Sequence, residues 1–269
     1  MNERKNAYPT VGFIGAGAIT QAVVTGFCER AADTPFPIVL SPRSRETAAR
    51  LRAAYPARVS VAQSMQEVLD RAEWVVLAVP PAVGEEVCRS LRFRADHKVI
   101  SFLSDKTLPQ LREWIGETAA LVHMVPLTFN AICDGPILLY PPRSEAAALF
   151  ARIGRVVEVD SPAKMSALST ITACVTPFFA VMDTLISWLG TQSVSAAQAT
   201  DYVTGFFSAM CSEAVSLAPE AVHRMAREST PGGINLMAKD IIQKAGGFAV
   251  WDRAMERVFA HVAEAPEDG

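Results

Sequence analysis

Short, almost uninterrupted apolar runs alternate with helical patterns over the first 160 residues of the chain. Such runs are typical of parallel strands that helices cover on both faces. We expect strands at residues 11–14, 37–40, 74–79, 99–103, 120–123 and 136–140, and helices between them at 44–55, 64–71 and 108–115. This repetition predicts right-handed crossovers and therefore an α/β fold with a doubly wound, mainly parallel sheet of the Rossmann type.

The second part of the chain has a different texture, with Ala, Ser, Met and Leu at helical spacing. We expect helices at residues 163–189, 195–217, 219–228, 233–244 and 248–263. This change predicts a domain boundary near residue 160, with an α/β domain of the Rossmann type at 1–160 and an all-helical domain at 161–269. The stretch from Met165 to Met182 is uncharged, but it contains five hydroxyl side chains and Pro177. We interpret it as a helix packed inside a domain or a dimer, with no membrane partner.

Charge and cysteine usage narrow the class of partner. With 25 Lys and Arg against 28 Asp and Glu, the formal net charge is -3, which gives no reason to expect nucleic acid. The five cysteines are scattered without C-x-x-C spacing, and the four histidines form no i, i+4 pair, so we expect neither disulfides nor a metal. The first residues lack the apolar stretch of a secretory signal, so we expect a cytoplasmic protein with a small-molecule partner.

A glycine-rich turn follows the first predicted strand and opens the first predicted helix. Glycine permits a tight turn at the first position and close approach of a pyrophosphate at the second, where the helix N-terminus holds the negative charge. The third glycine of the usual pattern is replaced by Thr20. The placement predicts a dinucleotide site. Its expected contacts at this turn are Gly15, Ala16, Gly17, Ala18 and Ile19.

The end of the second strand indicates which dinucleotide binds. An NAD site places an acidic residue there, whereas an NADP site supplies arginine for the 2′-phosphate. This chain has Ser41, Arg43 and Ser44, and no acid before Glu46. The pattern favours NADP(H). An alternative, compatible with it, is that Ser44 caps a helix whose solvated face carries the arginines.

Three segments resemble the pyrroline-5-carboxylate reductase family. Residues 11–26 resemble its phosphate-binding turn, residues 76–81 its fourth-strand loop, and residues 229–235 (Ser-Thr-Pro-Gly-Gly-Ile-Asn) its C-terminal signature. The resemblance implies an NAD(P)H-dependent reductase that converts a cyclic imine to proline. It also implies a Rossmann domain followed by a helical domain that forms a homodimer or a higher homo-oligomer, with the active site where the domains meet across the subunit interface. Further cofactor contacts implied by it are Ala78, Val79, Pro80 and Pro126.

The C-terminal signature is the implied substrate site. Backbone N–H groups at a helix start can hold a substrate carboxylate without a charged side chain. In the family, a threonine hydroxyl two places after the glycine pair bonds the ring nitrogen; here that position is Asn235, whose amide can also donate. Asn235 is therefore the expected catalytic residue. The expected substrate contacts are Thr230, Gly232, Gly233, Ile234 and Asn235.

The chain departs from the family pattern in three places. The Met-Pro-Asn-Thr-Pro loop is Val-Pro-Leu-Thr-Phe at 125–129, the Gly-Ser-Gly-Pro segment is Cys-Val-Thr-Pro at 174–177, and a lysine is replaced by Pro80. The substrate site has thus changed more than the cofactor site. This favours a divergent member, or a related reductase for a bulkier or more apolar imine or carbonyl compound.

Two other functions remain open. A β-hydroxyacid dehydrogenase would use a lysine such as Lys164, but Leu168 stands one turn on where that class has asparagine. A non-catalytic NADP(H) sensor would explain the changed substrate loop. His123, at the end of a strand, is a candidate cofactor contact or a structural histidine.

Overall fold

The computed structural model describes residues 9–30, 36–103, 105–228 and 230–263. Its contacts divide the chain into two compact units. The first contains the described residues up to Ser169 together with Val262 and Ala263, and the second contains residues 170–261.

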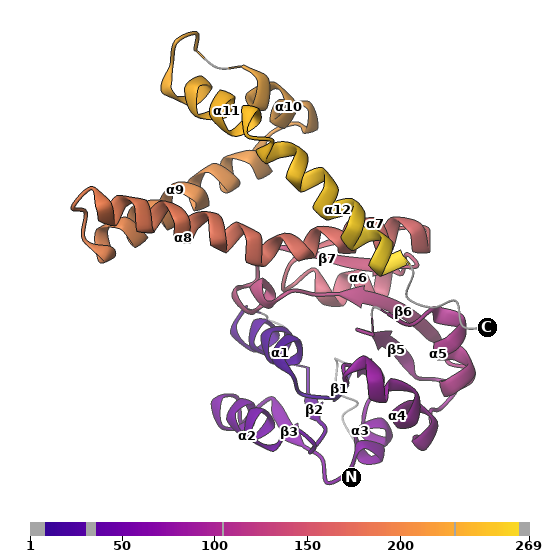
Figure 1. The fold of residues 1–269 in the computed structure, drawn as a ribbon. Helices are drawn as coiled ribbons and strands as arrows, with labels where there is room; N and C mark the ends of the chain where they lie inside the picture. Colours follow the sequence, from indigo (N-terminus) through magenta and orange to yellow (C-terminus); the bar gives the residue numbers. More distant parts are fainter. Residues whose placement is uncertain (1–8, 31–35, 104, 229, 264–269) are drawn as a thin grey trace. The chain divides into compact units, whose positions relative to one another are not determined.

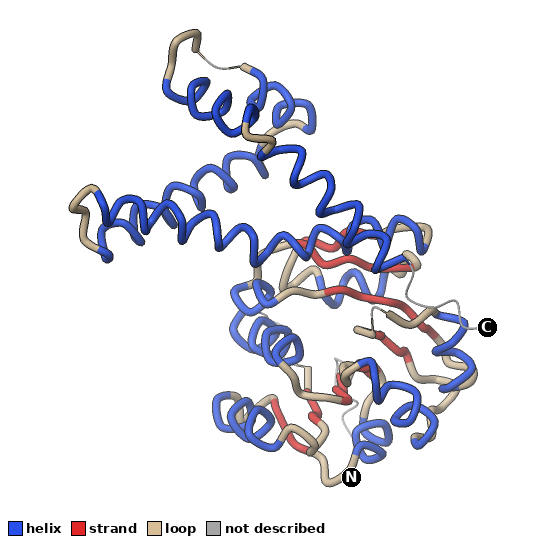
Figure 2. Tube along the Cα trace, in the orientation of Figure 1, coloured by secondary structure: helices blue, strands red, loops and turns tan. Residues whose placement is uncertain are grey.

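The first unit is built on one eight-stranded sheet (Figure 2). Its order is β3-β2-β1-β4-β5-β6-β7-β8, and every neighbouring pair is parallel except β6 with β7. The strands are β1 (Val11–Ile14), β2 (Ile38–Leu40), β3 (Val59–Val61), β4 (Trp74–Leu77), β5 (Lys98–Ser101), β6 (Ala120–Val125), β7 (Pro136–Tyr140) and β8 (Arg155–Glu158). The predicted doubly wound, mainly parallel sheet is confirmed, whereas β3 and β8 were not expected from the sequence.

Helices cover both faces of this sheet (Figure 1). The helices are α1 (Ala18–Arg30), α2 (Arg45–Ala54), α3 (Met65–Arg71), α4 (Gly84–Ser90), α5 (Leu108–Ile115) and α6 (Ser144–Phe150), with the 3-10 turns η1 (Pro81–Val83) and η2 (Thr128–Ile132). Successive residues of central strands such as β1 belong to opposite core clusters: Phe13 lies in the cluster that includes residues of α1, α2 and α6, and Ile14 in the one that includes residues of α3, α4 and α5. Two apolar faces explain why the strands are continuous apolar runs.

Local sequence signals fix the start of two of these helices. At α5, Thr107 Oγ1 accepts from the Gln110 backbone N–H at 3.3 Å, and Gln110 Oε1 accepts from the Thr107 backbone N–H at 2.8 Å. This reciprocal capping satisfies two N–H groups that the helix leaves free. At α3, Ser64 Oγ accepts from the Glu67 backbone N–H at 3.1 Å. Both helices therefore begin where their caps place them.

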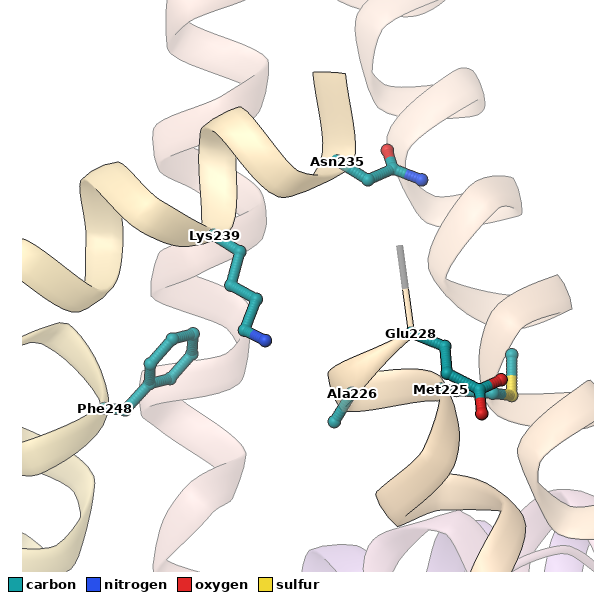
Figure 3. Close-up of a pocket in the computed structure, with 6 residues that line it drawn as sticks. All are labelled: Met225, Ala226, Glu228, Asn235, Lys239 and Phe248. Carbon is teal, nitrogen blue, oxygen red and sulfur yellow. The ribbon is translucent and has the colours of Figure 1, made fainter. Parts of the chain in front are cut away.

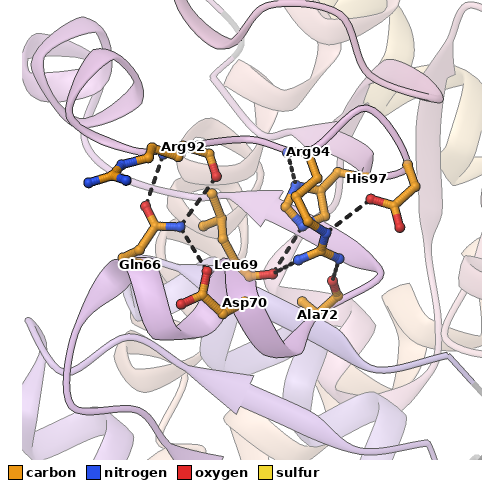
Figure 4. A network of polar contacts seen from close by, with 8 residues as sticks. Gln66, Leu69, Asp70, Ala72, Arg92, Arg94 and His97 are labelled. Carbon is orange, nitrogen blue, oxygen red and sulfur yellow. Dashed lines mark hydrogen bonds and ion pairs between the residues drawn. The ribbon is translucent and has the colours of Figure 1, made fainter.

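A polar network joins α3 to the loop before β5 (Figure 4). The Arg94 guanidinium donates to the carbonyls of Leu69 and Ala72 at 2.7 and 3.0 Å. His97 Nδ1 accepts from the Arg94 backbone N–H, so Nε2 carries the proton and donates to the Leu69 carbonyl at 3.0 Å. Burial lowers the pKa of His97, which keeps this neutral tautomer. His97 is a structural residue.

The helical part of the chain begins with α7 (Pro162–Thr170), which reaches the boundary between the units. It continues with η3 (Ile171–Cys174), α8 (Val175–Thr191), α9 (Ala196–Ser216), α10 (Pro219–Arg227), α11 (Ile234–Lys244) and α12 (Gly247–Ala263). The helix expected at 163–189 is found as one continuous helical stretch over 162–191, with the 3-10 turn η3 between α7 and α8. Pro177 lacks the N–H that would bond the carbonyl of residue 173, and at the third residue of α8 that donor is not needed.

The helices of the second unit leave large apolar side chains exposed. Phe179 and Trp188 on α8 and Tyr202 and Phe206 on α9 are 57%, 57%, 71% and 55% exposed. The stretch from residue 162 to 191 is long and apolar enough to span a membrane, judged by length and composition alone. Core helices of soluble proteins also pass this test. In this structure, 17% of its most apolar window of 18 residues is buried. Its apolar surface is therefore not covered by the described chain.

Candidate functional site

The glycine turn after β1 is held by contacts on three sides. Gly15 has φ +104°, a conformation that glycine adopts readily, and its N–H donates to Ser41 Oγ at 2.9 Å. The buried Thr20 hydroxyl donates to the Gly15 carbonyl at 3.1 Å. The Ala78 backbone N–H donates to the Ile14 carbonyl at 2.8 Å, which brings the end of β4 against the turn. Thr20, which replaces the third glycine, thus closes the turn through its side chain.

The open side of this turn faces solvent. Gly17 and Ala18 are exposed, Ile19 is half-buried and Ala16 is buried. No heavy atom lies within 4 Å of a Cβ placed on Gly17, so the backbone there is accessible to a ligand. The first turn of α1 leaves N–H groups without partners inside the helix, and its dipole adds partial positive charge. The arrangement suits a pyrophosphate.

The three predicted cofactor residues in the loop after β2 differ in their exposure. Ser41 is fully buried and its hydroxyl accepts the Gly15 N–H, so its side chain supports the turn. Arg43 is exposed, and Ser44 is half-buried at the N-cap position of α2. The Ser44 side chain makes no cap hydrogen bond, so the predicted helix-capping role of its hydroxyl is not seen in this structure.

The other predicted cofactor residues follow neighbouring strands. Ala78, Val79 and Pro80 come directly after β4, and Pro126 directly after β6. Strands β1, β2, β4, β5 and β6 are parallel, so their carboxyl ends lie along one edge of the sheet. The structure thus brings all of the predicted nucleotide-binding segments to one edge, where ligands bind in open α/β sheets.

Asn130, which the sequence analysis did not single out, holds the loop after β6. Its buried side chain accepts the Leu127 N–H at 2.7 Å and donates to the carbonyls of Asp134 and Ile153 at 2.8 and 3.2 Å. The same turn packs against α1 at Gly26, where a Cβ would collide with the Asn130 carbonyl. Asn130 therefore fixes the loop that carries Pro126.

His123 is buried on β6, beside the end of β5. Burial lowers its pKa to about 4, so the ring is neutral at pH 7. Within the described residues, His123 Nδ1 and Asp105 Oδ1 are buried without a hydrogen-bond partner. Such unpaired buried atoms are uncommon. They lie at the edge that carries the predicted nucleotide segments.

The predicted substrate residues lie in the second unit. Gly232 has φ +76° and precedes Gly233, the N-cap of α11. Thr230, Ile234 and Asn235 are exposed. The structure therefore places this group and the nucleotide group in different compact units.

A cavity of about 620 Å³ lies beside the start of α11 (Figure 3). Its lining residues come from the end of α10, from α11 and from the start of α12: Met225, Ala226, Glu228, Asn235, Lys239 and Phe248. Of the five predicted substrate contacts, Asn235 is the one that lines it. Lys239 was missed by the sequence analysis, although its position four residues after Asn235 places it on the same helix face.

Lys164 is a surface residue at the start of α7. Its ammonium forms an ion pair with Asp160 at 2.8 Å, and its side chain is 62% exposed. The described residues also contain no group of three or more His, Cys, Asp or Glu that is arranged to hold a metal ion.

Sequence comparison relates the chain to known reductases. Residues 10–105 match the family model "NADP oxidoreductase coenzyme F420-dependent". The chain is 27% identical over 183 residues to pyrroline-5-carboxylate reductase of Haemophilus influenzae, a match that covers 64% of this chain and 65% of that enzyme. It is also 27% identical over 124 residues to pyrroline-5-carboxylate reductase 2 of Bacillus subtilis, covering 45% and 44% of the two chains.

Solved structures with the same fold cover nearly the whole chain. Pyrroline-5-carboxylate reductase from Coxiella burnetii is 19% identical, with a TM-score of 0.81 and coverage of 97% and 99%. The NADP-bound Plasmodium falciparum pyrroline carboxylate reductase is 16% identical, with a TM-score of 0.80 and coverage of 96% and 98%. A reductive aminase from Aspergillus terreus, solved with NADPH4, cyclohexanone and allyl amine, is 15% identical, with a TM-score of 0.60 and coverage of 96% and 94%. The chain is thus similar in sequence to pyrroline-5-carboxylate reductases, and it shares the fold of those that have been solved.

Proposed function

We propose that the protein reduces a cyclic imine with NADPH. The observation that carries the proposal is the cavity at the start of α11, which is lined by Asn235, the residue at the family's catalytic position. The nucleotide edge of the first unit supplies the second requirement, a glycine turn with accessible backbone N–H groups. The family relatives and the reductive aminase neighbour support imine chemistry as the reaction class.

Different segments of the chain would bind the cofactor and the substrate. The turn from Gly15 to Ile19 would hold the pyrophosphate, and the segments at Ala78–Pro80 and at Pro126 would border the rest of the cofactor. The bound reduced nicotinamide supplies the hydride. Backbone N–H groups at the start of α11, next to Gly232 and Gly233, would bind the substrate carboxylate, with Thr230 and Ile234 beside them. The Asn235 amide would donate to the imine nitrogen, whose charge changes as the neighbouring carbon is reduced.

We further propose a two-domain cytoplasmic enzyme. Residues 1–160 would form the NADP-binding domain, and residues 161–269 the substrate and dimerisation domain. The exposed aromatic side chains of α8 and α9 support a homodimer or a higher homo-oligomer, because contiguous apolar surface of this kind is usually covered by a partner.

The proposal is tested by following NADPH absorbance with pyrroline-5-carboxylate, other cyclic imines and β-hydroxy or β-keto acids. We expect turnover with an imine. We expect Asn235→Ala to lower kcat about 10- to 1,000-fold, the cost of removing one donor to developing charge, while the Kd for NADPH stays within about twofold. Turnover of hydroxy acids alone would favour a β-hydroxyacid dehydrogenase, and NADPH binding without any turnover would favour a sensor.

Arg43→Ala tests the choice of cofactor. Arg43 is exposed beside the half-buried Ser44, and neither has an acidic neighbour before Glu46. Since a guanidinium would contact the 2′-phosphate, its loss should weaken NADPH binding about 10-fold or more, as for a charge-assisted hydrogen bond. NADH, which lacks that phosphate, should bind as before in a fluorescence titration. Equal weakening of both cofactors would reject the assignment.

A further inference from the structure

Lys239 is the half-buried basic residue of the cavity at α11. Most of that helix is exposed, including Asn235, Ile241 and Lys244, but Lys239 is partly covered. In Figure 3 the Lys239 side chain runs from α11 into the cavity and ends in the space between α11 and the end of α10. Residues four apart on a helix share a face, so Lys239 and Asn235 line the same wall one turn apart.

The ammonium of Lys239 has no anionic partner among the described residues. Glu228 is the acid that lines the cavity, and it forms an ion pair with Arg224 at 3.7 Å instead. Three other lysines in the described chain do pair with carboxylates: Lys98 with Glu145 at 2.9 Å, Lys106 with Asp105 at 3.2 Å and Lys164 with Asp160 at 2.8 Å. Lys239 thus presents an uncompensated positive charge to the cavity.

The remaining lining is largely apolar. In Figure 3, Met225 and Phe248 lie on opposite sides of the space, and Ala226 adds a small apolar side chain to the lining. A partly covered cation beside apolar walls favours an anionic ligand, because the ligand restores the interactions that the ammonium loses on leaving water. The N–H groups at the start of α11 favour the same sign of charge. A neutral apolar compound would leave the ammonium unpaired.

We propose that Lys239 determines substrate specificity by binding a carboxylate of the imine. This inference rests on the proposed function and deepens it. The site would select a carboxylated cyclic imine over the neutral ring of the same size. The apolar side chains would contact the ring, the amide of Asn235 would lie near its nitrogen, and the ammonium would pair with the carboxylate.

The test compares kcat/KM for pyrroline-5-carboxylate with kcat/KM for neutral 1-pyrroline. In Lys239→Met, which keeps most of the side-chain length, we expect this ratio to fall about 10- to 100-fold, as for a lost charge-assisted contact. Lys239→Arg should restore most of it. Lys244→Met is the matched control, since Lys244 lies on the same helix, is exposed and does not line the cavity. Its ratio should equal that of the wild type.

A decrease that is equal for both substrates, or no decrease, would overturn the assignment to Lys239. Binding distinguishes this outcome from failure of the proposed function. Tetrahydrofuran-2-carboxylate, titrated by calorimetry into the full-length protein with NADP⁺, should bind the wild type more tightly than Lys239→Met, whereas neutral tetrahydrofurfuryl alcohol should not discriminate. If no imine is reduced but this difference holds, imine reduction is rejected and carboxylate binding by Lys239 stands. Equal binding of the carboxylate to both proteins would reject the role of Lys239.

Discussion

The Gly15→Ala variant should lose measurable NADPH binding and at least about 3 kcal/mol of stability. Two effects add at this position. Gly15 has φ +104°, where an L side chain is strained, and a Cβ there would collide with the Ala78 carbonyl. Relief of the collision would separate the turn from β4 and lengthen the Gly15 N–H contact to Ser41. Urea unfolding and NADPH titration measure the two losses.

Gly17→Ala is the control for this variant. A Cβ on Gly17 meets no heavy atom within 4 Å, and its φ lies outside the positive region. Its stability should therefore stay within about 1 kcal/mol of the wild type. NADPH binding should still weaken, because the methyl group would occupy the path of the pyrophosphate. If Gly15→Ala unfolds like the wild type, or if Gly17→Ala binds NADPH as well as the wild type, this account of the turn is wrong.

Asn130→Ala should destabilise the protein by about 3–5 kcal/mol. The side chain is fully buried and makes three hydrogen bonds to the backbone, at Leu127, Asp134 and Ile153. Truncation leaves one N–H and two carbonyls short of a partner, and each costs about 1–3 kcal/mol when buried. Thermal and urea unfolding report the loss. Because the loop also carries Pro126, NADPH affinity should fall in the same variant.

Ile132→Ala provides the control in the same 3-10 turn. Ile132 is 69% exposed, so its truncation should change stability by less than about 0.5 kcal/mol. Asn130→Asp separates hydrogen bonding from volume, since the carboxylate can accept the Leu127 N–H but cannot donate to the two carbonyls. It should be nearly as destabilised as Asn130→Ala. An Asn130→Asp protein with wild-type stability would show that the two carbonyl contacts contribute little.

The long apolar runs of the sequence were enough to predict the sheet and its class. Central strands such as β1 and β4 are covered on both sides, so almost every residue had to be apolar. The strands that were missed lie nearer the margins: β3 has three residues, and β8 begins and ends with exposed charges, Arg155 and Glu158. A short or half-exposed strand is specified by its neighbour more than by its own residues. The 3-10 turn η3 was not predicted, although it ends three residues before Pro177, which the sequence analysis had noted.

The candidate site residues also differ in how far the sequence could predict them, depending on whether their role rests on local sequence or on contacts between distant segments. The glycine turn was predictable because the turn itself demands glycine at Gly15. The role of Asn130 was not predictable from the sequence. Its three backbone partners come together only when the loop after β6 has packed against Ile153, which precedes β8. Lys239 had a local signal, its spacing from Asn235. Its lack of a carboxylate partner also has a partly local cause, because Glu228 lies four residues after Arg224 and pairs with it. That Glu228 and Lys239 line one cavity is seen only in the folded helices.

The position of β1 has a consequence for the newly made chain. β1 precedes β2 and β4 in the chain, yet it lies between them, and Val11 pairs with both Ile38 and Trp74. At roughly 5–20 residues per second, the ribosome needs several seconds to add the residues that separate Val11 from Trp74. During that interval the edge of β1 that pairs with β4 has no hydrogen-bonded neighbouring strand, and the backbone of Ala78 is not yet beside Gly15. The glycine turn after β1 is encoded before β4, but it is completed only after β4 has emerged.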